Sequence, residues 1–389
     1  MTKLTAAPVS AAVTAPAINV PLFDLKRQQQ RLHARIGERL DRVLGHCQFV
    51  FGPEVEELER ELEKYCGARH AVGVSSGRDA LIMALMALGV GPGDAVFVPA
   101  FTFSATAGSV AATGASPVFV DVDEASFNMS AADLERAIGE VAARGELAPK
   151  VVMPVDLYGQ AADYAAIGEV AARHSLVVVA DSAQSFGGSV GNRKVGTMAQ
   201  ISATSFYPTK PLGGYGDGGA VFSDDDRLAA EVRLIRTHGR QGSGDEALRL
   251  GMTARLDTMQ AAVLLVKLEE FEKDLAARRR IARIYDAELK GVVQTPRLAE
   301  GIESAWALYT LRVENRDAVR QRLADAGVGT GLFYPLPLHK HAAFAPFVRG
   351  DEKLPVSEQL AKDVLSLPIF ADLEDNEIAH VIAEVKQAV

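Results

Sequence analysis

The chain has 389 residues, of which 48% are hydrophobic and 23% charged, and its formal net charge is −9. This length accommodates two or three domain-sized units, and the composition is too apolar for an intrinsically disordered protein. The absence of a sustained basic block argues against nucleic acid as a partner. No run of the sequence reaches the roughly 18 apolar residues that span a bilayer, so no membrane association is expected.

The two cysteines, Cys47 and Cys66, belong to no CxxC motif or Cys/His cluster. This spacing argues against a zinc site and against a disulfide framework, so we expect a protein of the reducing cytoplasm without a bound metal. Residues 1–20 are rich in alanine and are interrupted by two prolines. We interpret them as a flexible tail, with a signal peptide as the alternative.

Hydrophobic periodicity predicts the elements in chain order. Apolar residues recur three to four positions apart in two N-terminal segments, which predicts amphipathic helices over 22–44 and 53–66. Short β-branched runs then alternate with helical patterns. The expected strands are 71–76, 95–101, 116–122, 150–159, 176–184, 200–209 and 218–225. The helices expected between them are 77–89, 104–114 and 163–175. Repeated units of this kind imply an α/β fold with a largely parallel, buried sheet.

Past residue 226 the chain becomes mainly helical. A continuous helical pattern over 259–289 predicts a bridge helix into a second, smaller unit. Residues 305–313, a helix over 317–326 and the remaining C-terminal segment would form a small α/β layer. We therefore divide the chain into a tail (1–20), a large domain (21–265) and a small C-terminal domain (266–389).

Ligands of open parallel sheets bind outside the carboxyl ends of the strands, so polar residues at strand ends are the site candidates. Asp181 follows four apolar residues directly, and Gln184 lies three positions further on. An ionised carboxylate at the end of a buried strand must be paired with a donor or a cation. The alternative is an aspartate that only caps the following turn.

Lys210 lies between a strand and a loop with five glycines over 213–219, and Pro208 and Pro211 flank it. Desolvation lowers the pKa of a lysine and makes it a nucleophile that forms Schiff bases. The alternative is a solvated loop lysine. The loop does not match the GxxxxGK[ST] phosphate motif, which disfavours a nucleotide triphosphatase.

Two further strand ends carry candidate binding groups. Ser75 and Ser76 precede the glycine that opens a helix, and free amides at a helix start suit a phosphate. Phe101 and Phe103 follow the next strand, where an aromatic ring could stack on a planar ligand. The alternatives are an ordinary N-cap and ordinary core packing. A phosphate seat, a ring platform, a carboxylate and a lysine together suit pyridoxal phosphate (PLP).

The same residues resemble a known family, the DegT-type nucleotide-sugar aminotransferases. The resemblance runs from about residue 21 to the C-terminus and rests on seven segments: FGPEVEELE, SSGRDAL, VPAFTFSAT, ADSAQSFG, SFYPTKPLGGYGDGG, RLDTMQAAVLL and YPLPLH. It implies the PLP-dependent transferase fold type I, with a mostly parallel central sheet between helices and a smaller C-terminal α/β domain. It also implies that Lys210 forms the internal aldimine and shuttles the proton, and that Asp181 pairs with the pyridine nitrogen.

The resemblance implies further cofactor contacts. Gln184 lies beside the phenolic oxygen and Phe103 stacks on the ring, while the phosphate is held by Ser205 and the backbone around Gly77, Arg78 and Asp79. Members are homodimers with shared active sites, and many carry an asparagine that reaches the neighbouring subunit's cofactor phosphate. Thr253 stands at that position here, so that contact is in doubt, although its hydroxyl can still donate one hydrogen bond.

The resemblance also implies substrate contacts. Arg255 would clamp a carboxylate, with a structural intersubunit salt bridge as the alternative. Tyr334 and His339 fall in the sugar-facing segment, with simple packing as the alternative. The sequence around Pro211 is most similar to that of family members that aminate carbon 3 of UDP-linked N-acetyl-3-keto-glucuronic acids in lipopolysaccharide or O-antigen biosynthesis.

The expected reaction is a ping-pong transamination from L-glutamate to a nucleotide-linked keto sugar. Members that act on dTDP-linked 3-keto or 4-keto-6-deoxyhexoses, the alternative substrates, more often have asparagine directly after the lysine. An alternative of another class is a non-catalytic PLP-binding regulator on the same fold. Loss of Lys210 or Asp181 would favour that alternative, and both residues are present.

Overall fold

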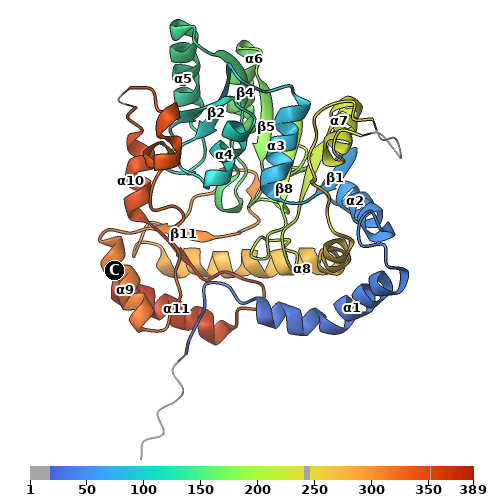
Figure 1. Cartoon of the computed structure of the whole chain (residues 1–389). Helices are drawn as coiled ribbons and strands as arrows, with labels where there is room; N and C mark the ends of the chain where they lie inside the picture. Colours follow the sequence, from blue (N-terminus) through green and yellow to red (C-terminus); the bar gives the residue numbers. More distant parts are fainter. Residues whose placement is uncertain (1–17, 241–245, 351) are drawn as a thin grey trace, which may run out of the picture.

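The computed structural model describes residues 18–240, 246–350 and 352–389 (Figure 1). The helices are α1 (Leu25–His46), α2 (Pro53–Cys66), α3 (Gly77–Ala87), α4 (Ser104–Ala112), α5 (Ala131–Arg144), α6 (Tyr164–Arg173), α7 (Asp226–Arg236), α8 (Thr258–Leu289), α9 (Arg316–Asp325), α10 (Pro355–Asp363) and α11 (Asp375–Ala388), with short 3₁₀ helices η1 (Leu157–Gly159), η2 (Leu338–Lys340) and η3 (Ala342–Phe347). The strands are β1 (His70–Val74), β2 (Asp94–Pro99), β3 (Ser116–Val120), β4 (Ala148–Val152), β5 (Val177–Asp181), β6 (Ser189–Val190), β7 (Arg193–Lys194), β8 (Ile201–Ser205), β9 (Gly219–Ser223), β10 (Ile302–Glu303), β11 (Tyr309–Arg312) and β12 (Val364–Leu367).

A seven-stranded sheet in the order β1-β9-β8-β5-β4-β2-β3 forms the centre of the molecule. Strands β8, β5, β4, β2 and β3 pair in parallel, which confirms the predicted mostly parallel α/β sheet. Strand β9 instead runs antiparallel to both β1 and β8. The connection from β8 to β9, residues 206–218, contains no helix to carry the chain back across the sheet, so β9 returns in the opposite direction.

Helices cover both faces of this sheet because its strands are apolar on both sides. In β2, Val96 and Val98 pack into the core under α3, α4 and α7, whereas Ala95 and Phe97 pack into the core under α5 and α6. Helices α2 and α8 cover the other half of this second face. The alternation places the sheet in the middle of a three-layer architecture.

Helix α8 is the predicted bridge helix, expected over 259–289 and observed over Thr258–Leu289. Figure 1 shows it running beneath the sheet, from α1 on one side toward α9 and α11 on the other. Its first half packs against the large sheet through Leu264, while Ile281 and Tyr285 join a separate core with β11, β12, α9 and α11. The proposed domain border at residue 265 therefore falls inside one continuous helix.

Chain segments on both sides of that border cross to the other unit. Residues 1–17 of the predicted tail lie outside the described residues, but Val20 is buried in the C-terminal core and its N–H bonds Gly327 O at 2.8 Å. Conversely, Leu338 and Phe344 pack into the core of the large sheet. Within the described ranges, no helix is long and apolar enough to cross a membrane.

Candidate active site

A cavity of about 330 Å³ lies at the carboxyl ends of β1, β2, β5 and β8. It is the place where predicted ligand-binding residues converge from distant parts of the sequence. Its lining includes nine of them: Ser76, Gly77, Arg78, Phe103, Asp181, Gln184, Ser205, Lys210 and Tyr334. The crossover topology brings these strand ends together, as expected for an open parallel sheet.

Asp181 is the last residue of β5, and its carboxylate is buried. The Thr106 hydroxyl donates to Oδ2 at 2.8 Å, and the Ala183 N–H donates to Oδ1 at 3.3 Å. Burial raises the pKa of Asp181 above its usual value, and these hydrogen bonds and the charge of Lys210 oppose the rise. No cation lies within ion-pair distance of Asp181 in the described part of the chain, so the carboxylate is available to a cationic ring nitrogen.

Lys210 lies in the loop after β8 and lines the same cavity as Asp181. Its backbone N–H bonds Tyr207 O at 2.9 Å, which fixes the turn that carries the side chain. Burial lowers the pKa of Lys210 to about 8, and the charge of Asp181 opposes the fall. A lysine with a pKa near neutrality is partly unprotonated and can attack an aldehyde.

The first turn of α3 supplies the anion-binding end of the cavity. Ser76 is the N-cap, and its Oγ accepts from the Asp79 N–H at 3.1 Å, while the Ser75 hydroxyl bonds the Asp79 carboxylate. This is the ordinary N-cap considered above, and it occupies Asp79, which does not line the cavity. Gly77 and Arg78 do line it. The structure thus leaves their amides, rather than that of Asp79, for an anion.

The ring end of the cavity is aromatic. Phe103 is 55% exposed and lines the cavity, whereas Phe101 is 1% exposed and packs in the core. The ring of Tyr334 lies 5.9 Å from that of Phe103. Gln184 Nε2 donates to the Tyr334 hydroxyl at 3.0 Å, and Gln184 Oε1 accepts from the Tyr158 N–H at 2.7 Å. The amide is therefore fixed beside the ring platform.

These features fit PLP on observations of the structure itself. One cavity is lined by four features: a buried carboxylate without a cation, an amine with a lowered pKa, an open helix N-terminus and an exposed aromatic ring. A residue larger than glycine at position 77 would clash, since its Cβ would lie 2.6 Å from Ser205 Cβ.

Residues 30–386 match the DegT/DnrJ/EryC1/StrS aminotransferase family. The chain belongs to this family.

The similar proteins include named aminotransferases and one protein named as a regulator. The UDP-2-acetamido-2-deoxy-3-oxo-D-glucuronate aminotransferase of Pseudomonas aeruginosa is 44% identical over 94% of this chain and 99% of its own. A protein of Geobacillus stearothermophilus named pleiotropic regulatory protein is 40% identical over 95% of this chain and 98% of its own. Among solved structures, a DegT/DnrJ/EryC1/StrS aminotransferase from Brucella abortus has a TM-score of 0.92 and 44% identity, covering 94% of this chain and 98% of that chain.

The cofactor prediction is confirmed at the level of the family. The NtdA structure from Bacillus subtilis contains the cofactor pyridoxamine phosphate (PMP); its TM-score is 0.88, its identity 28%, and it covers 97% of this chain and 86% of that chain. The predicted fold, with a mostly parallel sheet and a smaller C-terminal region, is confirmed by the same comparisons. The protein is an enzyme of a PLP-dependent sugar aminotransferase family.

Not every predicted site residue of this aminotransferase reaches the cavity. His339 is 4% exposed, its Nε2 lies 3.0 Å from Glu358 Oε1, and its ring packs 6.4 Å from that of Phe119. The 3₁₀ helix Leu338–Lys340 packs into the core of the large sheet and carries His339 with it. In this chain His339 therefore packs beside Phe119 and does not line the cavity.

Thr253 and Arg255 also lie outside the cavity of their own chain. They belong to the segment before α8 that runs beside the end of β1. There Arg255 forms an isolated backbone β-bridge with Val74, and the Ser75 N–H bonds Ala254 O at 3.1 Å. Thr253 is exposed, and its hydroxyl lies 3.2 Å from His238 Nε2. Neither residue lines the cavity that holds Lys210 of the same chain.

Sequence reasoning missed several residues of the aminotransferase site. Thr106 bonds Asp181, and Tyr207, Asp217 and Phe333 line the cavity. Thr106 lies one helical turn after Phe103, and this spacing at the start of α4 was a usable signal. The other three lie within quoted motifs or beside them but carry no pattern of their own.

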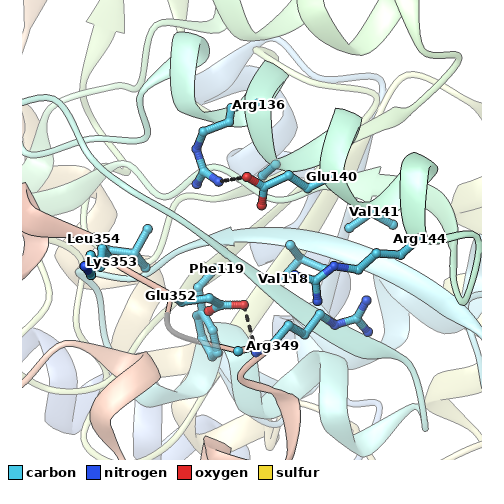
Figure 2. A pocket seen from close by; sticks show the side chains of 12 residues that line it. Val118, Phe119, Arg136, Glu140, Val141, Arg144, Arg349, Glu352, Lys353 and Leu354 are labelled. Atoms are coloured by element: carbon cyan, nitrogen blue, oxygen red, sulfur yellow. Dashed lines mark hydrogen bonds and ion pairs between the residues drawn. The ribbon is translucent and has the colours of Figure 1, made fainter.

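A second cavity, of about 510 Å³, lies between α5 and residues 349–350 and 352–354 (Figure 2). Charged side chains of both signs line it. Arg136 Nη1 forms an ion pair with Glu140 at 2.6 Å, whereas Glu352 accepts a hydrogen bond from the backbone N–H of Arg349 at 3.0 Å. None of the predicted ligand-binding residues is among the described residues that line it, whereas several of them line the first cavity.

Proposed function

We propose that this enzyme moves an amino group from L-glutamate to carbon 3 of a UDP-linked N-acetyl-3-keto-glucuronic acid. The observation that carries the proposal is the convergence of Lys210 and Asp181 in one cavity with the open start of α3. The 44% identity to an aminotransferase named for that substrate supports the acceptor.

Bound PLP supplies an electron-withdrawing ring and an aldehyde that carries the amino group between substrates. Asp181 would pair with the ring nitrogen and keep its proton in place, so that the ring stays cationic. Gly77 and Arg78 would offer backbone amides, and Ser205 a hydroxyl, to the phosphate. Phe103 would pack against the ring and exclude water from it.

Lys210 is the acid-base group of the proposed reaction. Among the described residues that line the cavity it is the one lysine. Its lowered pKa, about 8, leaves a useful fraction of the amine neutral near neutral pH. The amine would take the proton from the alpha carbon of the donor, and in the acceptor half-reaction it would deliver a proton to carbon 3 of the sugar.

We further propose a homodimer in which each cavity is completed by the second copy. Phe49 and Phe51 are exposed, and their loop is joined to the start of α8 by the Thr258 N–H, which bonds Phe49 O at 3.0 Å. This exposed apolar loop lies next to the segment that carries Thr253 and Arg255. A second copy seated there would bury the aromatic rings and would receive both side chains in its own cavity.

Arg255 then provides the specificity for an acid sugar. A guanidinium binds a carboxylate with two parallel hydrogen bonds, and glucuronic acids carry such a group whereas 6-deoxyhexoses do not. We also propose a cytoplasmic location, since Cys47 and Cys66 are both free thiols. One relative is named a regulatory protein, which favours the alternative of a non-catalytic regulator. A regulator without catalytic activity would not require both Lys210 and Asp181, however, and both are present.

A direct comparison of acceptors tests this proposal. Purified protein with PLP and L-glutamate is expected to aminate the UDP-linked uronate faster than a dTDP-linked 3-keto-6-deoxyhexose. Arg255→Gln is expected to raise KM for the uronate by about tenfold, because it removes one charged contact. The same variant is expected to leave KM for the neutral sugar unchanged. A strong preference of the wild type for the neutral sugar would contradict the proposed substrate.

A further inference from the structure

Asp156 is a fully buried carboxylate that lies behind the active-site turn and is absent from the cavity lining. It follows β4, where the chain continues beside the end of β5. The Asp156 N–H bonds Asp181 O at 3.0 Å, and the Asp181 N–H bonds Pro154 O at 2.9 Å. The backbone of Asp156 thus already adjoins the residue that faces the ring nitrogen.

Four donors converge on the Asp156 carboxylate. Oδ1 accepts from the Ala162 N–H at 2.8 Å and from the Tyr164 hydroxyl at 2.7 Å. Oδ2 accepts from the Ser182 hydroxyl at 3.0 Å and from the Ser185 hydroxyl at 2.7 Å. An ionised carboxylate has about four acceptor positions, so this set saturates it. Burial raises the pKa of Asp156 to about 6, and the four donors oppose the rise.

The two carboxylate oxygens face different parts of the chain. Oδ1 is bonded by the loop before α6 and by α6 itself, whereas Oδ2 is bonded only by the turn 181–185. Within that turn the side chains point in two directions. Asp181, Ala183 and Gln184 line the cavity, and the two serine hydroxyls point away from it to Asp156.

We propose that Asp156 is a positioning residue that holds the turn 181–185 from behind, so that Asp181 and Gln184 keep their places in the cavity. Both sides of the turn are then fixed: the serines by the charge of Asp156, and Gln184 by the Tyr158 N–H on the same segment. Charge-assisted hydrogen bonds suit this task because they are short and directional. The inference rests on the proposed cofactor contacts of Asp181 and Gln184.

Two sets of variants separate positioning from general stability. Ser182→Ala/Ser185→Ala removes both hydrogen bonds on Oδ2, the side of the turn. Tyr164→Phe is the matched control, since it removes one buried hydrogen bond to Oδ1 of the same carboxylate and leaves the turn bonded. Asp156→Asn keeps the shape but removes the charge, and it remains available if the double variant does not fold.

The probe is PMP, which binds without reacting with Lys210. Its dissociation constant is measured by titration of each apo protein, together with the melting temperature. The double variant and Asp156→Asn are expected to bind PMP about tenfold more weakly, the loss of one charged hydrogen bond. Their kcat at saturating cofactor is expected to fall with little change in KM for the keto sugar. Tyr164→Phe is expected to lower the melting temperature but to bind PMP within about twofold of the wild type.

The outcomes are distinguishable. If the double variant and Asp156→Asn bind PMP as tightly as the wild type, Asp156 does not position the turn and the inference is overturned. Equal weakening by Tyr164→Phe would also overturn it, because the effect would then be general loss of stability. If the wild type itself fails to bind PMP, the proposed function fails instead.

Discussion

Burial in the cavity shifts Lys210 and Asp181 toward their neutral forms. It lowers the pKa of the amine to about 8 and raises that of the carboxyl group, while the attraction between the two charges opposes both shifts. The pair is thus poorly solvated before a ligand binds. A cationic ring nitrogen offers Asp181 the partner that water no longer supplies, and a carbonyl carbon offers Lys210 a bond that needs no charge.

The lowered pKa of Lys210 predicts the pH dependence of cofactor capture. Only the neutral amine attacks an aldehyde, so the rate at which apo protein captures PLP, trapped by borohydride reduction, should rise with pH and reach half its maximum near pH 8. Asp181→Asn removes the charge that favours the ammonium, so its midpoint should move to lower pH. A midpoint near the ordinary lysine value of about 10.4 would show that the amine is solvated.

At the scale of elements, α3 joins the sheet to the proposed phosphate site. Its first turn is packed so closely on β8 that a Cβ on Gly77 would lie 2.6 Å from Ser205 Cβ and 3.1 Å from Ser205 Cα. The second distance involves backbone, so a larger residue must displace the start of the helix. The amides that point into the cavity would move with it.

Gly77→Ala is therefore expected to weaken PMP binding by about tenfold, while binding of pyridoxamine, which lacks the phosphate, changes little. Isothermal titration of both ligands measures the difference. Gly108→Ala in α4 is the matched control, because a Cβ at that position would lie 3.8 Å from its nearest neighbour, Arg78 Nη2. Equal losses for the two ligands would place the effect outside the phosphate seat.

The elements themselves were largely predictable, because hydrophobic periodicity is local. The bridge helix was placed to within one residue at its start, and Lys210 and Asp181 were located as polar residues at strand ends. The direction of β9 was not predictable, since an apolar run reads the same in either direction. The spacing of Thr106 from Phe103 could place Thr106 near the cavity, but its hydrogen bond to Asp181, 75 residues away, was not predictable. Contacts over such separations depend on tertiary packing.

At the scale of the whole molecule, both units contribute to one cavity. Phe333 and Tyr334, which come after the bridge helix, line it beside residues of the large sheet. Helix α1 also spans the two units: Arg27 bonds Glu377 of α11 at 2.6 Å, and Arg31 bonds Asp274 of α8 at 2.7 Å. These contacts fix the small unit against the cavity, so the site depends on the complete chain.

Sharing of residues between copies predicts complementation. At a uronate concentration below KM, Lys210→Ala should be inactive and Arg255→Ala should keep about a tenth of the wild-type activity, whereas the hybrid dimer of the two should keep about half, since one of its two sites is intact. Activity per mole of hybrid dimer, isolated by two affinity tags, measures this directly. If Arg255 serves the cavity of its own chain, the hybrid has no intact site and its activity stays at or below that of Arg255→Ala.

The central claim is that Lys210 binds PLP covalently and that glutamate donates the amino group. The absorbance spectrum of the purified protein, reconstituted with PLP and recorded before and after L-glutamate is added, tests it most directly. We predict the visible band of the lysine-bound cofactor, its loss on addition of glutamate, and its return when the UDP-linked keto uronate is supplied. A protein that shows no such band with PLP, or a band that glutamate leaves unchanged, would contradict the assignment.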